Sequence, residues 1–382
     1  MRTPVVLVCG QGNADGVADM LVQEPGTVVV RHRFDGQVVL RSVDTRYGTS
    51  QWPLEVANGC VACTVRDDLL ALLRRLHQRS DVRRIVVHLM AWLEPEPVCW
   101  AIINGPAAGD VRVDAVVTTI ETSNWLTQSL GDGELDDGRM VAQVVVGQAE
   151  FADVLVLTEP EAKTLSVLRR LAPRSRITVG TDWLETALGH LESDARRGRS
   201  SHPHEPLLSG EPSLDPDGDV GLLLFTARRP FHPQRLHTAL DLLLDGVVRA
   251  RGRLWLANRF DDVMWVESAG GGLMFNYIGK WLAATDSNQL AYADPQRRAL
   301  AAADWNSRVG DRHVSVTALV CGAEPEDIVD GLRRALLTND ELSRPTEWES
   351  YDDPFGDWHE DPCELSERSD VTPTPEGEER TT

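Results

Sequence analysis

The chain has 382 residues, of which 59 are acidic and 38 basic, so its formal net charge is −21 at pH 7. DNA binding depends on counterion release by Lys and Arg, and we do not expect a chain this acidic to bind DNA. Its length fits two or three domains. The scattered cysteines, the lack of an apparent secretory signal and the lack of a long apolar run predict a cytoplasmic protein that does not enter a membrane.

In the first half of the chain, short apolar runs alternate with helical patterns. The predicted strands are residues 5–9, 27–31, 37–41, 84–89, 115–119 and 154–157. A short helix is predicted around 18–23. The clearest helix is 64–79, where leucines form one stripe and Thr64 begins a capping pattern with Asp67. This alternation indicates an α/β fold with a mainly parallel sheet covered by helices on both faces.

The composition changes near residue 191 to Ser, Pro, Asp, Gly and His, which is typical of a linker. Beyond it, strands are predicted at 222–227, 253–258, 263–267 and 313–320, with helices at 233–244 and 325–337, which is an α+β order. We therefore divide the chain into a first domain (1–190), a linker (191–220), a smaller α+β domain (221–340) and an acidic, partly disordered tail (341–382). Residues 340–382 hold 15 acidic and 3 basic side chains, a net charge of −12.

A strand, a glycine-containing loop and a helix at the N-terminus are the arrangement of a phosphate-binding loop. Aligning GxxxxGK[ST] from Gly10 places Asp15 at the second glycine, Gly16 at the lysine and Val17 at the hydroxyl residue. The groups that hold phosphate and Mg²⁺ are therefore missing, and Asp15 adds a negative charge. We interpret the loop as a degenerate nucleotide site, with a plain strand-to-helix turn as the simpler alternative.

Two further motifs carry a resemblance to a known family. Residues 58–69 read NGCVACTVRDDL, which resembles the NGC-x-CC-T-[VI]-R-x-D-L motif of the CobW family of GTPase metallochaperones. Residues 229–236 (RPFHPQRL) and 252–257 (GRLWLA) are similar to the hallmark of the CobW C-terminal domain. The resemblance implies a P-loop-GTPase-like first domain and a CobW C-terminal domain, in which the motif residues are Arg229, Phe231, His232 and Arg235. We expect a structural role for His232.

The family's other nucleotide motifs depart from their pattern at the positions that match them. The Walker B carboxylate falls near His88. The guanine-reading NKxD motif falls on Thr158, Glu159 and Glu161, where Glu159 reverses the charge of the lysine and Glu161 is one methylene longer than aspartate. We therefore expect little or no GTP hydrolysis and assign no catalytic residue, with weak nucleotide binding left as an alternative.

The family's metal motif has three cysteines, and Ala62 replaces the middle one. Cys60 and Cys63, which we expect just before the helix, are left as an incomplete zinc site. Three interpretations stay open: two thiols without a ligand, a zinc site completed by His32 or His88, and a redox pair. No cofactor is therefore required, and zinc and GTP are the candidates.

Three other features each have a plain and a functional interpretation. His202 and His204 in the linker are either solvated or metal ligands. The arginines at 74, 75, 79, 83 and 84 form a solvated helix face or a contact for RNA phosphate or an acidic protein. The aromatic and acidic segment 353–358 either docks on a basic partner or packs back on its own domain.

The degenerate loop, the 229–236 motif and the DPFGDWH segment at 353–359 together resemble mycobacterial members of the family that recruit a hibernation factor of the protein Y type. That resemblance implies an adaptor that acts in zinc starvation, with the 30S or 70S ribosome and the hibernation factor as partners. The alternative is a GTP-dependent zinc metallochaperone. Cys60 and Cys63 favour this alternative, whereas Gly16, Val17 and Ala62 disfavour it.

Overall fold

The computed structural model describes residues 1–36, 38–56, 61–208, 210 and 212–356. Eight strands of these residues form the first sheet, in the order β4-β3-β2-β5-β1-β6-β7-β8. They are β1 (Thr3–Gly10), β2 (Thr27–Phe34), β3 (Val39–Thr45), β4 (Gly48–Leu54), β5 (Arg84–His88), β6 (Val111–Ile120), β7 (Val154–Leu157) and β8 (Arg176–Val179). Strands β3 and β4 are antiparallel additions at one edge, and the other neighbours in this sheet run parallel.

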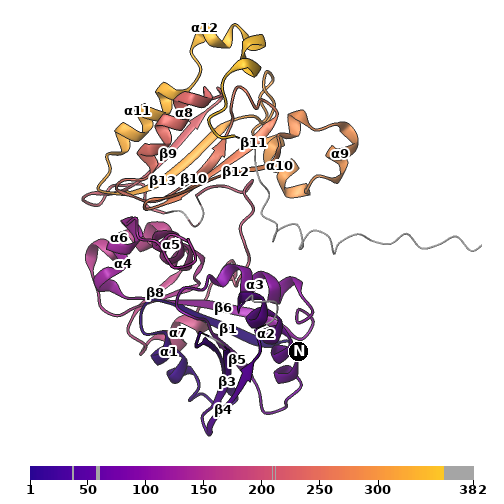
Figure 1. The fold of residues 1–382 in the computed structure, drawn as a ribbon, viewed down its shortest axis with the longest axis vertical. Coiled ribbons are helices and arrows are strands. Elements are labelled where there is room, and N and C mark those ends of the chain that lie inside the picture. The colour runs from indigo at the N-terminus through magenta and orange to yellow at the C-terminus, as the bar shows by residue number, and fades with distance from the viewer. Residues whose placement is uncertain (37, 57–60, 209, 211, 357–382) are drawn as a thin grey trace, which may run out of the picture.

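Helices cover both faces of this sheet (Figure 1). One face packs against α1 (Ala14–Leu21) and α7 (Leu184–Gly189), and the other against α2 (Val61–His77) and α3 (Pro95–Asn104). Successive side chains of a strand point to opposite faces. On β1, Val6 and Val8 therefore pack with α1 while Val5 and Leu7 pack with α2. The predicted parallel α/β architecture is confirmed.

The second sheet is antiparallel and comes from the C-terminal half of the described residues, in the order β12-β11-β10-β13-β9. Its strands are β9 (Val220–Ala227), β10 (Val247–Leu254), β11 (Asp262–Ala269), β12 (Gly272–Lys280) and β13 (Val314–Cys321). Helices α8 (Pro233–Leu240) and α11 (Pro325–Ala335) cover one face. Helices α9 (Ser287–Tyr292) and α10 (Pro295–Ala303) project beside β12, and α12 (Asn339–Leu342) follows α11. The predicted α+β second unit is confirmed.

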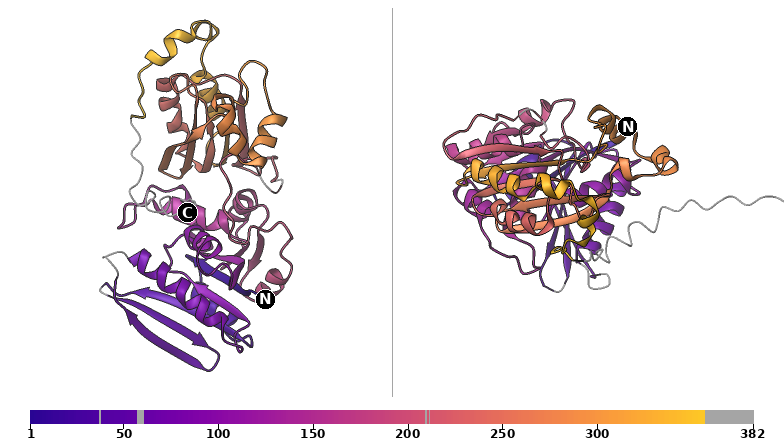
Figure 2. Two further views of the ribbon diagram at one scale, coloured as in Figure 1. Left: turned by 90° about the vertical axis from the view of Figure 1, so that its right-hand side faces the viewer. Right: turned by 90° about the horizontal axis from the view of Figure 1, so that it is seen from above.

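A layer of helices joins the two sheets, as Figures 1 and 2 show. It consists of α4 (Thr122–Leu130), α5 (Val141–Phe151) and α6 (Ala162–Leu171), and one apolar cluster combines their side chains with residues of β9, β10 and β13. The turn between β11 and β12 lies directly on this layer. A Cβ atom on Gly270 would lie 2.5 Å from the carbonyl oxygen of Gly131, and the amide of Gly271 donates to that oxygen at 3.0 Å.

Several predicted boundaries are wrong. The first helix begins at Ala14 instead of residue 18. Helix α2 already includes Val61, so Thr64 is a buried residue inside the helix and does not cap it. The strand expected at 253–258 is β10, which ends at Leu254. Three arginines alternate along β10, so its sequence lacks the apolar run that would predict a buried strand. The arginines are accommodated because each has polar partners from other parts of the chain. No predicted strand covers β4, β8 or β12.

The part of the segment 353–358 that is described packs back on its own domain. The Phe355 ring stacks on Phe275 with centroids 4.1 Å apart, and Arg259 forms an ion pair with Asp353 at 2.6 Å. Trp348 precedes it in a short 3₁₀ helix, Pro345–Ser350, and is buried. Residues 357 and 358 lie outside the described residues. No helix in the described part of the chain is long and apolar enough to cross a bilayer.

Candidate functional site

The loop after β1 does not have the shape of a phosphate cradle. Only three residues separate the end of β1 at Gly10 from the start of α1 at Ala14. Asn13 caps α1, and its Oδ1 accepts a hydrogen bond from the amide of Gly16 at 2.9 Å. In a working phosphate-binding loop, backbone amides of this stretch point at the ligand. Here the Gly16 amide already donates to Asn13, and α1 begins at Ala14, within the residues aligned with the loop.

Ion pairs within the chain fill the charged surface beside this loop. Asp15 approaches Arg33 at 3.2 Å and Arg31 at 3.6 Å. Arg31 is buried and also pairs with Asp19 at 2.6 Å and with Asp44. A bound polyphosphate would meet the carboxylate of Asp15 and would have to compete for both arginines. Val17 is fully buried in the core and offers no hydroxyl to a metal ion.

His88 stands at the end of β5, where the family has its acidic residue. Its buried Nε2 has no hydrogen-bond partner among the described residues and lies 3.8 Å from a carboxylate oxygen of Asp15. Burial lowers the pKa of His88 below its ordinary value, although Asp15 opposes this shift. The imidazole is therefore neutral at neutral pH and does not replace the missing carboxylate.

The residues at the guanine-reading position have structural partners instead. The side chain of Glu161 caps α6, where it accepts hydrogen bonds from the amides of Lys163 at 3.0 Å and Thr164 at 2.6 Å. These hydrogen bonds lower its pKa. The hydroxyl of Thr158 donates to Glu121 at 3.1 Å, and Glu159 is exposed. The residues present therefore do not fit a guanine nucleotide with Mg²⁺.

The start of α2 has different chemistry. His32 on β2 hydrogen-bonds through Nε2 to Asp68 of α2 at 2.8 Å, and Arg41 pairs with the same carboxylate at 2.6 Å. Burial by itself would raise the pKa of Asp68, but the hydrogen bond from His32 and the charge of Arg41 outweigh it and lower the pKa. Cys63 lies in the first turn of α2 rather than before the helix, and it is half-buried. Cys60 lies outside the described residues.

The structure separates the two histidines that were candidates for a third zinc ligand. His32 lies on the sheet face of Val28 and Val30, which pack with α2, whereas His88 lies on the face of Val86, which packs with α1. Only His32 shares a face with the helix of Cys63. The sequence could have predicted this, because residues 28, 30 and 32 alternate along one strand and must therefore lie on the same face of the sheet. Among the described residues, no group of three or more His, Cys, Asp or Glu side chains is arranged to hold a metal ion.

The C-domain motif holds the second domain together. Phe231 is fully buried, and its backbone bonds to Trp255 and Ala257. Arg229 donates to the carbonyl oxygen of Leu337 at 2.7 Å. Arg235 makes two hydrogen bonds to the Glu341 carboxylate at 2.9 and 2.7 Å.

His232 stacks on Tyr351 with ring centroids 4.5 Å apart. The structural role expected for this histidine fits that contact.

The remaining sequence candidates are engaged within the chain. In the arginine run, Arg74, Arg79 and Arg84 pair with Asp110, Asp81 and Glu185 at 3.2, 2.7 and 2.7 Å. In the linker, the rings of His202 and His204 stack at 5.2 Å. Burial and nearby arginines lower the pKa of His204 to about 3.

The comparisons with known proteins agree with these observations. Residues 29–173 match the family described as CobW/HypB/UreG, nucleotide-binding domain, and residues 220–336 match the cobalamin synthesis protein cobW C-terminal domain. The first match begins downstream of the loop at 10–17. A zinc chaperone of Mycobacterium tuberculosis (strain ATCC 25618 / H37Rv) is 60% identical over 378 residues, which are 95% of each chain.

More distant relatives are also similar. Zinc-regulated GTPase metalloprotein activator 1 of Dictyostelium discoideum is 24% identical over 343 residues, 79% of this chain and 70% of that protein. The Zn(II)-bound YjiA GTPase from E. coli aligns at 15% identity over 88% of this chain and 99% of that chain, with a TM-score of 0.39.

Proposed function

Since the chain belongs to the CobW family and carries the family's C-terminal domain, we propose that it is a zinc chaperone that works without GTP turnover at its N-terminal loop. Zinc is its cargo. The proposal rests on the chemistry at the start of α2, where His32 of β2 contacts Asp68 of α2 at 2.8 Å and Cys63 lies in the first turn of the same helix. It is supported by the 60% identical relative, which is itself named a zinc chaperone.

The proposed ligands are Cys63, His32 and Asp68, joined by Cys60. They would have to come together when zinc binds, because no three such side chains of the described residues are arranged to hold a metal ion. Sulfur, nitrogen and oxygen donors of these types are those that zinc uses in proteins. His32 and Asp68 already touch at 2.8 Å, so zinc would have to open their hydrogen bond in order to bind. A site that must break an internal contact binds its metal less tightly than a closed structural site. Such a site suits a protein that passes its metal on.

GTP turnover is left out of the proposal because the nucleotide positions serve other purposes. The side chain of Asn13 accepts a hydrogen bond from the amide of Gly16, and Asp15 pairs with Arg33. Lys163, close to the guanine-reading position, pairs with Asp219 at the start of the second domain at 2.6 Å. A GTPase needs these regions to change with the bound nucleotide. Here the same regions are tied to the chain itself.

The experiment is a zinc titration of the purified protein against a chromophoric chelator. We expect one zinc per chain and a loss of affinity of roughly tenfold or more in Cys63→Ser and in His32→Ala, since each removes one ligand. His88→Ala is the matched control, because it removes an imidazole from the opposite face of the sheet and should leave the affinity unchanged. Absence of zinc binding, or equal effects of the two histidine variants, would overturn the proposal.

A second candidate function is the adaptor that brings a protein Y-type hibernation factor to the ribosome in zinc starvation. The observation that favours it is the loss of the nucleotide site on an otherwise complete two-domain fold. We rank it second because three arginines of the run at 74–84 are ion-paired within the chain. Co-sedimentation with 30S and 70S particles tests it: equal loading of the hibernation factor with and without this protein at low zinc would contradict it.

A further inference from the structure

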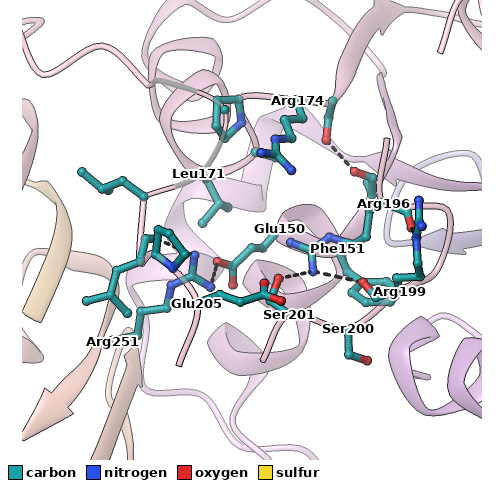
Figure 3. A pocket seen from close by; sticks show the side chains of 18 of the residues that line it. Glu150, Phe151, Leu171, Arg174, Arg196, Arg199, Ser200, Ser201, Glu205 and Arg251 are labelled. Atoms are coloured by element: carbon teal, nitrogen blue, oxygen red, sulfur yellow. Dashed lines mark hydrogen bonds and ion pairs between the residues drawn. The ribbon is translucent and has the colours of Figure 1, made fainter. Parts of the chain in front are cut away.

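A large hollow in the described part of the chain lies between the two domains. It is a cavity of about 1180 Å³, walled by the end of α5, the loop from α6 to β8, the linker and strands β10 and β11 (Figure 3). Pockets for small molecules commonly measure about 300–1,000 Å³ and often form at domain interfaces. The cavity is therefore large enough for a ligand of nucleotide size. It is separate from the degenerate loop, since neither Gly10–Val17 nor His88 lines it.

Three carboxylates of this cavity already have close partners within the chain. Glu150 pairs with Arg251 at 2.6 Å and with Arg249 at 3.1 Å, and Arg249 also pairs with Glu267 at 3.0 Å. Asp153 accepts hydrogen bonds from two backbone amides at 2.9 Å. Glu96, Asp194 and Glu205 also line the cavity and would oppose an anion near them. An anion is therefore expected only where arginines without close ion pairs lie.

Three other arginines of the wall have weak or neutral partners. Arg196 donates to the hydroxyl of Ser201 at 3.1 Å, and Arg199 donates to two backbone carbonyls at 3.2 Å each. Arg174 has only a loose ion pair with Asp194, at 3.6 Å between two side chains that are at least half exposed. An anion could bind these guanidinium groups without breaking a close ion pair.

The three arginines come from two segments that face the same hollow. Figure 3 shows Arg174 on the loop after α6, while Arg196 and Arg199 lie on the linker beside Ser200 and Ser201. Guanidinium forks and hydroxyl groups are the donors that best match the oxygens of a phosphate. Phe151 lies under the Arg196 guanidinium at 5.2 Å, which helps to hold that side chain.

We propose that this cavity binds a small phosphorylated molecule, whose phosphate oxygens are held by Arg174, Arg196 and Arg199. The ligand would touch the first domain, the linker and the second domain together, and would therefore stabilise their arrangement. The inference is independent of the zinc proposal because none of the zinc ligands lines the cavity.

The test is calorimetric titration of the full chain with inorganic pyrophosphate and, separately, with GTP, both in EDTA so that zinc and magnesium play no part. We expect binding of both probes, weakened by salt and reduced roughly tenfold or more in the double variant Arg196→Ala, Arg199→Ala. The control is Arg75→Ala, which removes one guanidinium charge from an exposed position on α2 and should bind as the parent does.

A stability measurement and a second variant distinguish loss of the ligand's contacts from misfolding of the double alanine variant. The unfolding midpoint of the double variant is measured first, and Arg196→Lys, Arg199→Lys keeps the charge but loses the fork and should bind with intermediate affinity. Failure of both probes to bind the parent chain would overturn the inference. Equal affinity in the parent and in the double alanine variant would also overturn it, because the binding would then lie elsewhere.

Discussion

At the scale of single residues, Glu341 shows how the C-domain motif works. Its carboxylate receives both arms of Arg235 and also completes a capping box with Thr338 at the start of α12. The hydrogen bonds from Arg235 lower the pKa of Glu341 to about 2. A carboxylate with a depressed pKa stabilises the folded state above its unfolded pKa, and this contribution is lost as the pH falls towards the folded value.

We therefore expect Glu341→Gln to lower the free energy of unfolding by about 1–2 kcal/mol at pH 7, since a helix cap and a charged hydrogen-bond pair are both weakened. The difference should shrink between pH 4.5 and pH 2, where the parent carboxylate itself takes up a proton. Urea unfolding at several pH values measures it. Glu349→Gln, at an exposed position nearby, serves as control. A pH-independent difference would show that the ionised carboxylate is not what matters.

Also at this scale, Asp15 and Asn13 decide what the first loop can do. Asp15 holds Arg33, and Asn13 caps the helix. Asp15 stands where the motif has its second glycine, whereas the motif specifies no residue at position 13. The loss of nucleotide chemistry therefore lies in the backbone as well as in the missing lysine and hydroxyl.

At the scale of elements, the start of α1 leads to a second prediction. The triple variant Asp15→Gly, Gly16→Lys, Val17→Thr restores the letters of the phosphate-binding motif, but Asn13 still caps the helix. We expect no GTP·Mg²⁺ binding tighter than about 1 mM, because the amides of Gly12, Ala14 and Gly16 already donate hydrogen bonds within the chain. Calorimetry of the triple variant beside the parent chain measures this. Micromolar binding in the variant would mean that side chains alone had disabled the loop.

Strand β10 carries three arginines within a buried sheet. Arg249, Arg251 and Arg253 alternate along it, and all three point to the face that carries the linker and the first domain. Arg251 donates to Leu207, and Arg253 donates to Pro203 and Glu205, all at linker carbonyl oxygens. The strand thus binds the linker to the second sheet through its side chains.

At the scale of the whole molecule, Glu150 couples the two domains. Its side chain is 11% exposed and lies on α5 of the first domain, opposite Arg249 and Arg251 of the second. Burial alone would raise its pKa, but the two guanidinium groups outweigh that effect and lower it. Removing one partner from a buried charge group leaves the others without compensation.

We expect Glu150→Gln to lower the free energy of unfolding by about 3 kcal/mol, because Arg249 would then keep only Glu267 and Arg251 only the carbonyl oxygen of Leu207. Guanidinium chloride unfolding measures the loss. Glu24→Gln, which removes an exposed carboxylate just after α1, is the matched control. If the Glu150 variant were as stable as the control, the ion pairs at this interface would contribute little, and the apolar cluster would hold the domains together.

The sequence alone determined the family, the parallel α/β first domain, the α+β second domain and the loss of the nucleotide motifs. Those features rest on local patterns and on residue types at fixed spacing. Only the tertiary structure selected His32 over His88 as the neighbour of the cysteine helix, paired most of the arginine run and brought Arg174, Arg196 and Arg199 to one cavity. These outcomes depend on which distant strands and loops meet. These long-range contacts are set by how the elements pack, and no periodic pattern of residues in the sequence predicts them.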